Sequence, residues 1–248
     1  MVRYILVGDN QASKIYVNYK EKACKKVGIK TINHNLPENT EFSTLAELIE
    51  KLNRDSQVDG ILLQLPLPSH LDEDKLLEMI DPDKDVDGFH PLNVGKLILG
   101  KETFVSATPL GIMNLLKAHD IKFKGKEAVV VGRSNIVGKP IAALLTAHDA
   151  TVTICHSKTI ELEKQIARAQ ILIVAVGKRG VVKPQWIPSG CVVVDVGTHR
   201  LDSGKVVGDL DFEEVSRKAA WITPVPGGIG PMTIASLLQN TVKAALNH

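Results

Sequence analysis

A predicted helix near the N-terminus carries an aromatic residue and a lysine at a spacing that suits proton transfer. In "SKIYVNYKEKAC", Tyr16 and Lys20 are four residues apart, so they lie on the same face of a helix. Loss of solvation beside an aromatic ring can lower the pKa of a lysine ammonium, which makes it useful as an acid or base near neutrality. The segment contains several other lysines that we expect in solvent, so spacing alone does not distinguish Lys20 from them.

A glutamine in an apolar strand is the second candidate for chemistry. In "ILLQLPLP", Gln64 stands close to the carboxyl end of the strand. Pro66 and Pro68 end this strand, because neither can continue the hydrogen-bond ladder of a sheet. A buried amide without partners costs about 1–3 kcal/mol. Gln64 therefore either bonds to local backbone or points into a cleft and orients another polar group; the sequence leaves both readings open.

An acidic loop supplies the third candidate. In "DPDKDVDGFHP", Asp83, Asp85 and Asp87 precede Gly88 and copy the first half of an EF-hand calcium loop. The twelfth position of that loop is Val94, where calcium binding needs a glutamate, and no flanking helix pair is evident, so we expect no metal. The alternative is a rigid loop in which one carboxylate, Asp87, binds amino or amide donors of a heterocyclic substrate.

The segment "VVVGRSNIVGKP" predicts a strand, a turn and a helix. Gly132 and Gly138 bound the turn, but the usual dinucleotide-binding fingerprint has three glycines, so the match is weak when taken alone. Between the two glycines, Arg133 offers a cation. Ser134 offers a helix N-cap whose hydroxyl could also reach a phosphate.

The surrounding pattern strengthens the nucleotide hypothesis. Apolar runs recur at 151–155, 171–177 and 191–197, and helix-like segments separate them at 138–148 and 160–169. Continuous apolar strands are typical of a parallel sheet buried on both faces, and alternation with helices predicts a doubly wound sheet. Such sheets bind ligands at the carboxyl ends of their strands. Here these ends are Gly132, His156, Gly177 and Gly197.

The end of the second strand in this sheet indicates which dinucleotide binds. A sheet that holds a free ribose 2′-hydroxyl has an acidic residue there, whereas this sequence reads "CHSKT". Ser157 and Lys158, with Arg133 across the turn, suit a 2′-phosphate and so favour NADP over NAD. The alternative is that Ser157 and Lys158 cap the next helix and face solvent.

Composition limits the classes of function. The 248 residues have a formal net charge of +2, which shows no basic surplus for nucleic-acid binding. Cys24, Cys155 and Cys191 are odd in number and far apart, which suggests reduced thiols in a cytoplasmic protein rather than disulfides or a zinc site. No apolar stretch reaches membrane-spanning length, and we expect no signal peptide. No zinc-protease, serine-hydrolase or P-loop motif occurs.

The elements group into two units, and we expect a cleft between them. Residues 1–107 form a smaller α/β unit, and 108–231 form the nucleotide-binding unit. The Pro- and Gly-rich segment "TPVPGGIGPMT" leads into a last helix, within 232–248, that returns to the first unit. For the first unit we predict strands at 4–8, 30–36 and 60–68, helices at 13–27 and 44–54, and a polar loop at 81–93.

Seven motifs occur in this order along nearly the whole chain. They are "ASKIYVNYKEKAC", "DGILLQLPLP", "PDKDVDGFHPLNVGKL", "VVVGRSNIVGKP", "ILIVAVGK", "GKVVGDLDF" and "TPVPGGIGPMT". Together they resemble the bifunctional methylenetetrahydrofolate dehydrogenase/methenyltetrahydrofolate cyclohydrolase family. The resemblance implies a two-domain α/β fold with a Rossmann-like doubly wound parallel sheet for the cofactor.

The resemblance also implies an activity. Enzymes of this family oxidise 5,10-methylenetetrahydrofolate to the methenyl form with NADP⁺ and hydrolyse that product to 10-formyltetrahydrofolate at an overlapping site, as part of one-carbon metabolism. It further implies a homodimer joined through the cofactor units, with no metal and no nucleic-acid or membrane partner.

Particular residues take their roles from the resemblance. Lys20 becomes the catalytic lysine that manages proton transfers, and Gln64 positions it. Tyr16 stacks against the folate, and Asp87 binds its pterin edge. Further residues of the substrate site are Pro66 and Gly228. The implied cofactor residues are Gly132, Arg133, Ser134, Ile136, Ser157, Lys158, Gly177 and Thr198.

The sequence departs from the family pattern at two places. Family members usually have a further segment, including a helix, before the "ILVG" strand, and Thr198-His199 stands where Ile-Asn is common. Some relatives use NAD. Two alternatives therefore stand beside the bifunctional enzyme: a monofunctional dehydrogenase for another small substrate, and a truncated, catalytically weak folate- or nucleotide-binding protein.

Overall fold

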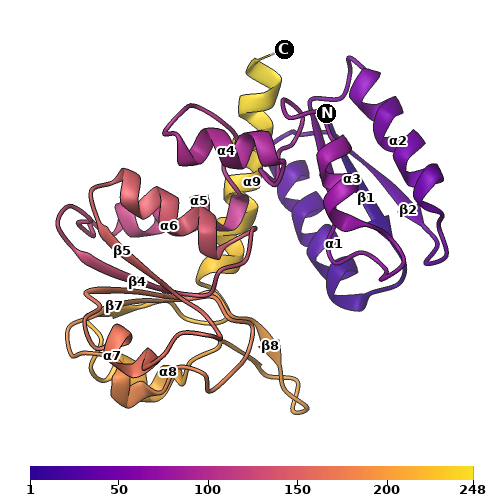
Figure 1. Ribbon diagram of the computed structural model, residues 1–248. Coiled ribbons are helices and arrows are strands. Elements are labelled where there is room, and N and C mark those ends of the chain that lie inside the picture. The colour runs from indigo at the N-terminus through magenta and orange to yellow at the C-terminus, as the bar shows by residue number, and fades with distance from the viewer. Residues whose placement is uncertain (248) are drawn as a thin grey trace. The chain divides into compact units, whose positions relative to one another are not determined.

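The computed structural model describes residues 1–247, apart from the side chain of Ala12. The chain divides into two compact units, shown in Figure 1. Unit 1 comprises Met1–Ala107 together with the C-terminal segment that starts at Ile234, and unit 2 comprises Thr108–Thr233. Within residues 1–247, no helix combines the length and the apolar character that a membrane crossing requires.

Unit 1 contains a three-stranded parallel sheet. Its strands are β1 (Val2–Val7), β2 (Thr31–Leu36) and β3 (Gly60–Leu63), in the order β2-β1-β3. The register aligns Val2 of the central strand with Thr31 on one side and Gly60 on the other. The helices of this unit are α1 (Gln11–Lys26), α2 (Phe42–Arg54), α3 (Glu73–Met79) and α4 (Pro91–Ile98), and it also includes α9 (Ile229–Leu246) from Ile234 onward.

The core of unit 1 follows from the two-residue period of its central strand. Ile5 points to one face, where it packs in a cluster with Ile49 of α2. Tyr4 points to the opposite face, where its cluster includes Val17 of α1 and Leu237 of α9. Burying each such side chain contributes about 1.5–3 kcal/mol, so both helical layers hold β1 in place. The face that carries Tyr4 and α1 also carries Lys20.

Unit 2 contains a five-stranded parallel sheet. Its strands are β4 (Glu127–Val131), β5 (Thr151–Cys155), β6 (Ile171–Val174), β7 (Val192–Asp195) and β10 (Trp221–Ile222), in the order β10-β7-β6-β4-β5. Figure 1 shows α6 on one face of this sheet and α7 and α8 on the other. Its helices are α5 (Ala107–Ala118), α6 (Gly138–Ala147), α7 (Leu162–Ile166), α8 (Phe212–Ser216) and the 3-10 helix η1 (Pro184–Trp186); β8 (His199–Arg200) and β9 (Val206–Val207) form a hairpin.

The strand order places a ligand position between β4 and β6. From β4 the chain moves outward to β5 and then returns past β4 to form β6, so the direction of winding reverses between these two strands. In open α/β sheets, ligands bind outside the carboxyl ends of the strands at such a reversal. Here these ends lead directly into Gly132 and Ala175. In unit 1 the corresponding reversal lies between β1 and β3.

Several predicted elements differ from the observed ones. The strand predicted at 60–68 ends at Leu63, so Gln64 follows the strand instead of lying inside it. The strands predicted at 171–177 and 191–197 end at Val174 and Asp195, and the helix predicted at 160–169 covers only Leu162–Ile166. The apolar runs continue beyond these strands into loops whose first residues, such as Leu65, Val176 and Val196, are partly buried.

Two further differences concern position in the fold. The strand at Thr151–Cys155 is partly exposed, contrary to the expectation of burial on both faces, because β5 is an outer strand of the sheet. The last helix begins at Ile229, three residues before the predicted Met232. Helix α3 and helix α4 were not predicted, and α4 begins within the region predicted as a polar loop.

Candidate active site and cofactor site

Three of the predicted catalytic residues meet in unit 1. The Nζ atom of Lys20 donates a hydrogen bond of 3.2 Å to Oε1 of Gln64 and lies 4.0 Å from Oδ2 of Asp87. Lys20 is only 6% exposed, whereas Lys22 and Lys25 of the same helix are exposed. Burial thus distinguishes Lys20 from its neighbours, as spacing alone could not.

Gln64 bonds to local backbone and also contacts the polar side chain of Lys20. Its backbone N–H donates to the carbonyl of Ile5 at 2.9 Å, which extends the β1–β3 pairing by one residue. Its side-chain Nε2 donates to the carbonyl of Leu65 at 2.7 Å, and its Oε1 accepts from Lys20. The local backbone bond fixes the amide orientation, and that orientation presents an acceptor to the lysine.

The loop that carries Asp87 is held by the buried carboxylate of Asp85. Its Oδ1 accepts from the N–H of Gly88 at 3.1 Å, and its Oδ2 accepts from the N–H of His90 at 2.8 Å and from Nδ2 of Asn93 at 2.9 Å. Among residues 1–247 there is no group of three or more His, Cys, Asp or Glu residues arranged to hold a metal ion. The hydrogen bonds of Asp85 to Gly88, His90 and Asn93 hold this acidic loop in one conformation.

Two further contacts fix the same loop from outside it. Gly88 has a φ of +72°, and a Cβ there would lie 2.5 Å from the backbone nitrogen of Ser106, so this position requires glycine. From α9, Nδ2 of Asn240 donates to the carbonyls of Val86 and Val105, both at 2.9 Å. The C-terminal helix thus holds two chain segments together: the one that precedes Asp87 and the one that ends at Val105.

Burial determines the electrostatics of this group. Burial raises the pKa of the Asp87 carboxyl, the charge of Asp85 raises it further, and the Lys20 ammonium opposes the rise. Tyr16 lies one helical turn before Lys20 and is half-buried, and burial raises the pKa of its phenol, which stays neutral at physiological pH. The arrangement brings a lysine Nζ, an amide oxygen and a buried carboxyl together around one position.

The other two predicted substrate residues, Pro66 and Gly228, belong to different units. Pro66 is exposed and follows Leu65 through a cis peptide bond, two residues after Gln64. Gly228 belongs to unit 2, where a Cβ would lie 2.5 Å from the carbonyl oxygen of Pro224. Its part in the substrate site stays a prediction.

The β4–α6 turn depends on its two glycines. Gly132 has a φ of +131°, and a Cβ there would clash with the carbonyl oxygen of Ala175 at the end of β6. A Cβ at Gly138 would clash with the carbonyl oxygen of Gly132. The Ser134 hydroxyl accepts from the N–H groups of Val137 at 3.2 Å and Gly138 at 3.3 Å, which leaves its own proton for another acceptor.

The other proposed cofactor residues of this turn and of the next one are exposed. Arg133 and Ile136 are exposed on the β4–α6 turn. After β5, Ser157 and Lys158 are exposed in a turn in which Nδ1 of His156 accepts from the backbone N–H of Lys158 at 3.1 Å. The N-cap residue of helix α7 is Glu161. The alternative in which Ser157 and Lys158 cap this helix is therefore wrong.

Gly177 and Thr198 follow β6 and β7, and one residue that sequence reasoning missed connects their loops. Asp209 accepts through Oδ2 from the N–H of Gly177 at 3.0 Å, and its Oδ1 lies 2.7 Å from Nε2 of His199. Asp209 could have been found from its position in the family motif "GKVVGDLDF". Thr198 is exposed beside this pair.

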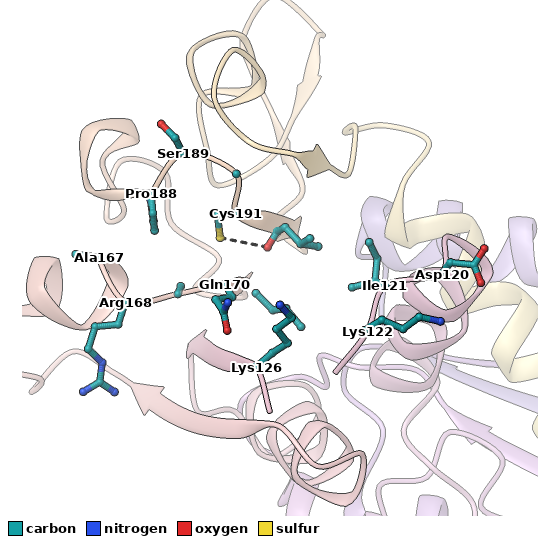
Figure 2. A pocket seen from close by; sticks show the side chains of 14 residues that line it. Asp120, Ile121, Lys122, Lys126, Ala167, Arg168, Gln170, Pro188, Ser189 and Cys191 are labelled. Atoms are coloured by element: carbon teal, nitrogen blue, oxygen red, sulfur yellow. Dashed lines mark hydrogen bonds between the residues drawn. The ribbon is translucent and has the colours of Figure 1, made fainter. Parts of the chain in front are cut away.

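Unit 2 also has a cavity at the end of its sheet opposite to the proposed cofactor turns. It has a volume of about 470 Å³, and its lining includes Lys126, Gln170 and Cys191, each of which immediately precedes a strand (Figure 2). Burial raises the pKa of the Cys191 thiol to about 12. Because this cavity lies at the amino ends of β4, β6 and β7, it is distinct from the turns that follow their carboxyl ends.

Sequence comparison decides which family these two units represent. The family model for the catalytic domain of tetrahydrofolate dehydrogenase/cyclohydrolase matches residues 1–87, and the model for the NAD(P)-binding domain of the same family matches residues 106–248. The chain belongs to this family. The resemblance inferred from the motifs is confirmed, together with the two-domain α/β fold and the paired dehydrogenase and cyclohydrolase functions.

Individual relatives agree over nearly the full chain. The bifunctional protein FolD of Campylobacter hominis is 57% identical over 244 residues, which are 98% of this chain and 86% of that protein. The crystal structure of the bifunctional enzyme FolD from Campylobacter jejuni has a TM-score of 0.97 at 54% identity, over 99% of this chain and 88% of the other. The Trypanosoma brucei dehydrogenase-cyclohydrolase, complexed with NADP cofactor and inhibitor, has a TM-score of 0.95 at 36% identity, over 99% and 86%.

Proposed function

We propose that this member of the tetrahydrofolate dehydrogenase/cyclohydrolase family oxidises 5,10-methylenetetrahydrofolate with NADP⁺ and hydrolyses the methenyl product to 10-formyltetrahydrofolate. The observation that carries the residue assignment is the contact of Lys20 with Gln64 beside Asp87. Residues 1–107 and 232–248 form the folate and catalytic domain, and residues 108–231 form the NADP domain. Neither the monofunctional dehydrogenase nor the weak binding protein is favoured by the relatives.

The oxidation needs positioning more than acid–base chemistry. A C–H bond of the methylene carbon breaks, and its electron pair leaves with the hydrogen to NADP⁺, which supplies the hydride acceptor when bound. The remaining methenyl cation is stabilised by the two folate nitrogens. The chain's task is to hold the reacting rings against each other without competing water. Tyr16 stacks against the folate, and Asp87 accepts hydrogen bonds from the pterin edge.

The hydrolysis needs one proton carrier. Water adds to the methenyl carbon and loses a proton, and the adduct then opens when a ring nitrogen gains a proton. Lys20 holds and moves that proton at Nζ, because it is buried beside the carboxyl of Asp87. Gln64 keeps the ammonium in place through Oε1. From this position Nζ of Lys20 can return the proton to the leaving nitrogen.

The turns of unit 2 fit NADP. Gly132 and Gly138 keep the β4–α6 turn free of side chains that would block close approach of a diphosphate, and Ser134 retains a donor. Arg133 and Ile136 are exposed on this turn, Gly177 is assigned to the cofactor site, and Thr198 is assigned to its nicotinamide end. Ser157 and Lys158 supply a hydroxyl and a cation for the 2′-phosphate, which explains a preference for NADP over NAD.

A homodimer and a cytoplasmic location complete the proposal. Strand β5 pairs only with β4 within the described sheet, and Ile154 on it is 41% exposed. An outer strand of this kind is a surface that a second copy can cover. Cys24, Cys155 and Cys191 are buried free thiols, which suits a reducing compartment.

One spectrophotometric experiment tests the two activities together. The purified protein and its Lys20→Met variant are given 5,10-methylenetetrahydrofolate with NADP⁺ or NAD⁺, and methenyl hydrolysis is followed separately. We expect NADPH production by the wild type and loss of hydrolysis in the variant. A folded wild-type protein that turns over with neither cofactor would contradict the proposal.

A further inference from the structure

Asp209 joins the two loops that follow neighbouring strands β6 and β7. Its side chain is 1% exposed. Through Oδ2 it accepts from the backbone N–H groups of Val176 and Gly177, both at 3.0 Å, and through Oδ1 it contacts Nε2 of His199 at 2.7 Å. Both of its oxygens are therefore used, one on each loop.

A second buried carboxylate fixes Asp209 itself. Asp195, at the end of β7, accepts through Oδ1 from the N–H groups of Gly197 and Asp209, both at 3.0 Å. A Cβ at Gly197 would clash with the Asp209 carboxylate, and a Cβ at Gly208 would clash with that of Asp195. The two glycines thus allow two carboxylates and two loops to pack closely, and the position of Asp209 is set before any ligand binds.

The loops held in this way carry two of the proposed cofactor residues. Gly177 bonds directly to Asp209, and Thr198 immediately precedes His199. Since β6 and β7 are adjacent and parallel, both loops leave the sheet at the same edge. A ligand at that edge meets backbone groups whose geometry is already fixed, so less conformational freedom is lost on binding.

We propose that Asp209 is a positioning residue for the dinucleotide, which holds the Val176–Gly177 backbone and His199 so that Gly177 and Thr198 present a fixed surface to NADP⁺. His199 is the second half of this device, because it ties the β7 loop to the same carboxylate. The inference rests on the cofactor site proposed above. It adds two residues that do not themselves need to touch the cofactor.

Four variants test this role. Asp209→Ala removes both acceptors, whereas Asp209→Asn keeps an oxygen for the two backbone N–H groups and offers its amide to the other tautomer of His199. His199→Ala removes only the second tie, and His199→Gln restores a donor at the position of Nε2. Each variant is compared with wild type for NADP⁺ affinity by calorimetry, for KM and kcat of the dehydrogenase, for methenyl hydrolysis without NADP⁺, and for thermal stability.

The expected pattern separates positioning from general stability. Asp209→Ala should raise the KM and the dissociation constant for NADP⁺ about tenfold, and His199→Ala about threefold, while hydrolysis stays near wild type. Asp209→Asn and His199→Gln should restore affinity to within about threefold of wild type. If Asp209→Ala fails to fold, the His199 pair decides the question by the same criterion.

Two results would overturn the inference. Unchanged NADP⁺ affinity in both alanine variants would show that the loops need no such tie. An equal fall of both activities with lower thermal stability would show a purely structural role. A wild-type protein that does not bind NADP⁺ at all would instead contradict the underlying cofactor assignment and remove the inference with it.

Discussion

Lys20 donates a 3.2 Å hydrogen bond to Oε1 of Gln64, a residue 44 positions away in the chain. Gln64 is itself held by its bond to the carbonyl of Leu65 at 2.7 Å. Because the amide nitrogen is engaged by backbone, the amide oxygen faces the lysine. One local contact after β3 thus helps to fix the position of Lys20 Nζ, the proposed proton carrier.

We expect Gln64→Ala to reduce methenyl hydrolysis by about tenfold or more, because the buried ammonium loses its fixed acceptor. The dehydrogenase step should fall less, since it needs no proton transfer at this position. Initial rates of both reactions measure the difference. Gln57→Ala, at an exposed glutamine of the same unit, is the matched control. Equal losses in both reactions would argue against a specific role in proton transfer.

The Asp87 carboxyl should make stability depend on pH in a defined direction. Burial raises its pKa in the folded chain, so between its ordinary and its raised pKa the folded state binds more protons than the unfolded state. The stability that comes from burying the neutral Asp87 carboxyl is therefore fully present below the ordinary aspartate pKa. It is lost as the pH rises from the ordinary pKa through the raised pKa of the folded state. Asparagine does not titrate, so the stability of Asp87→Asn relative to wild type should improve from about pH 4 toward neutrality.

Urea unfolding of both proteins at a series of pH values checks this result. A relative stability that declines toward neutral pH would mean that the contact with Lys20 outweighs burial. Methenyl hydrolysis by Asp87→Asn should still fall, because Asp87 lies 4.0 Å from Nζ of Lys20, the proposed proton carrier.

Gly132→Ala should destabilise the protein by about 3 kcal/mol and abolish NADP⁺ binding, because the new methyl group meets the carbonyl oxygen of Ala175. Gly125→Ala separates this clash from backbone strain. Gly125 also has a positive φ, +71°, but a Cβ there would meet no atom of the described chain within 4 Å. Its substitution should cost about 1–2 kcal/mol and leave NADP⁺ affinity unchanged. Similar behaviour of the two variants would refute the steric explanation.

Lys158→Ala should raise the KM for NADP⁺ about fivefold and leave the KM for NAD⁺ unchanged, because only NADP⁺ carries the 2′-phosphate. The difference should shrink at high ionic strength, since Lys158 is exposed. Steady-state kinetics with both cofactors measure it. Lys164→Ala removes another exposed lysine of unit 2 and serves as the control. A parallel change with NAD⁺ would place Lys158 away from the ribose.

Ile154→Lys should convert the proposed dimer to a monomer, because a charge on β5 prevents a second copy from covering that strand. Light scattering after size-exclusion chromatography measures the mass. Phe212→Lys, at an exposed apolar residue of α8, should leave it unchanged. A wild-type protein that is monomeric throughout the concentration range would remove the dimer from the proposal.

Local patterns predicted the alternation of strands and helices, but not where in a sheet each strand would lie. The run at Thr151–Cys155 is as β-branched as the run at Ile171–Val174, yet only the second is fully buried. The difference arises from strand order, which depends on pairings between distant segments. The short helix α3 and the helix that starts at Pro91 escaped prediction because polar residues in this region obscure their apolar positions.

The site shows the same limit more sharply. Lys20 could be named only through the family motif, because burial of one lysine among several is a property of packing. Asp209 was missed since its backbone partners lie 32 and 33 residues away, at Gly177 and Val176. Residues whose chemistry is local, such as the glycines of the β4–α6 turn, were identified directly.

The bonds from Asn240 to Val86 and Val105 bear on how the enzyme is made by the ribosome. Unit 2 is one continuous stretch, Thr108–Thr233, whereas the loop that presents Asp87 needs a residue close to the end of the chain. During synthesis, residues 1–107 therefore lack their contacts with Asn240 while Thr108–Thr233 is being made. The segment around Asp87 gains its contacts with Asn240 only after the whole of Thr108–Thr233 has been synthesised.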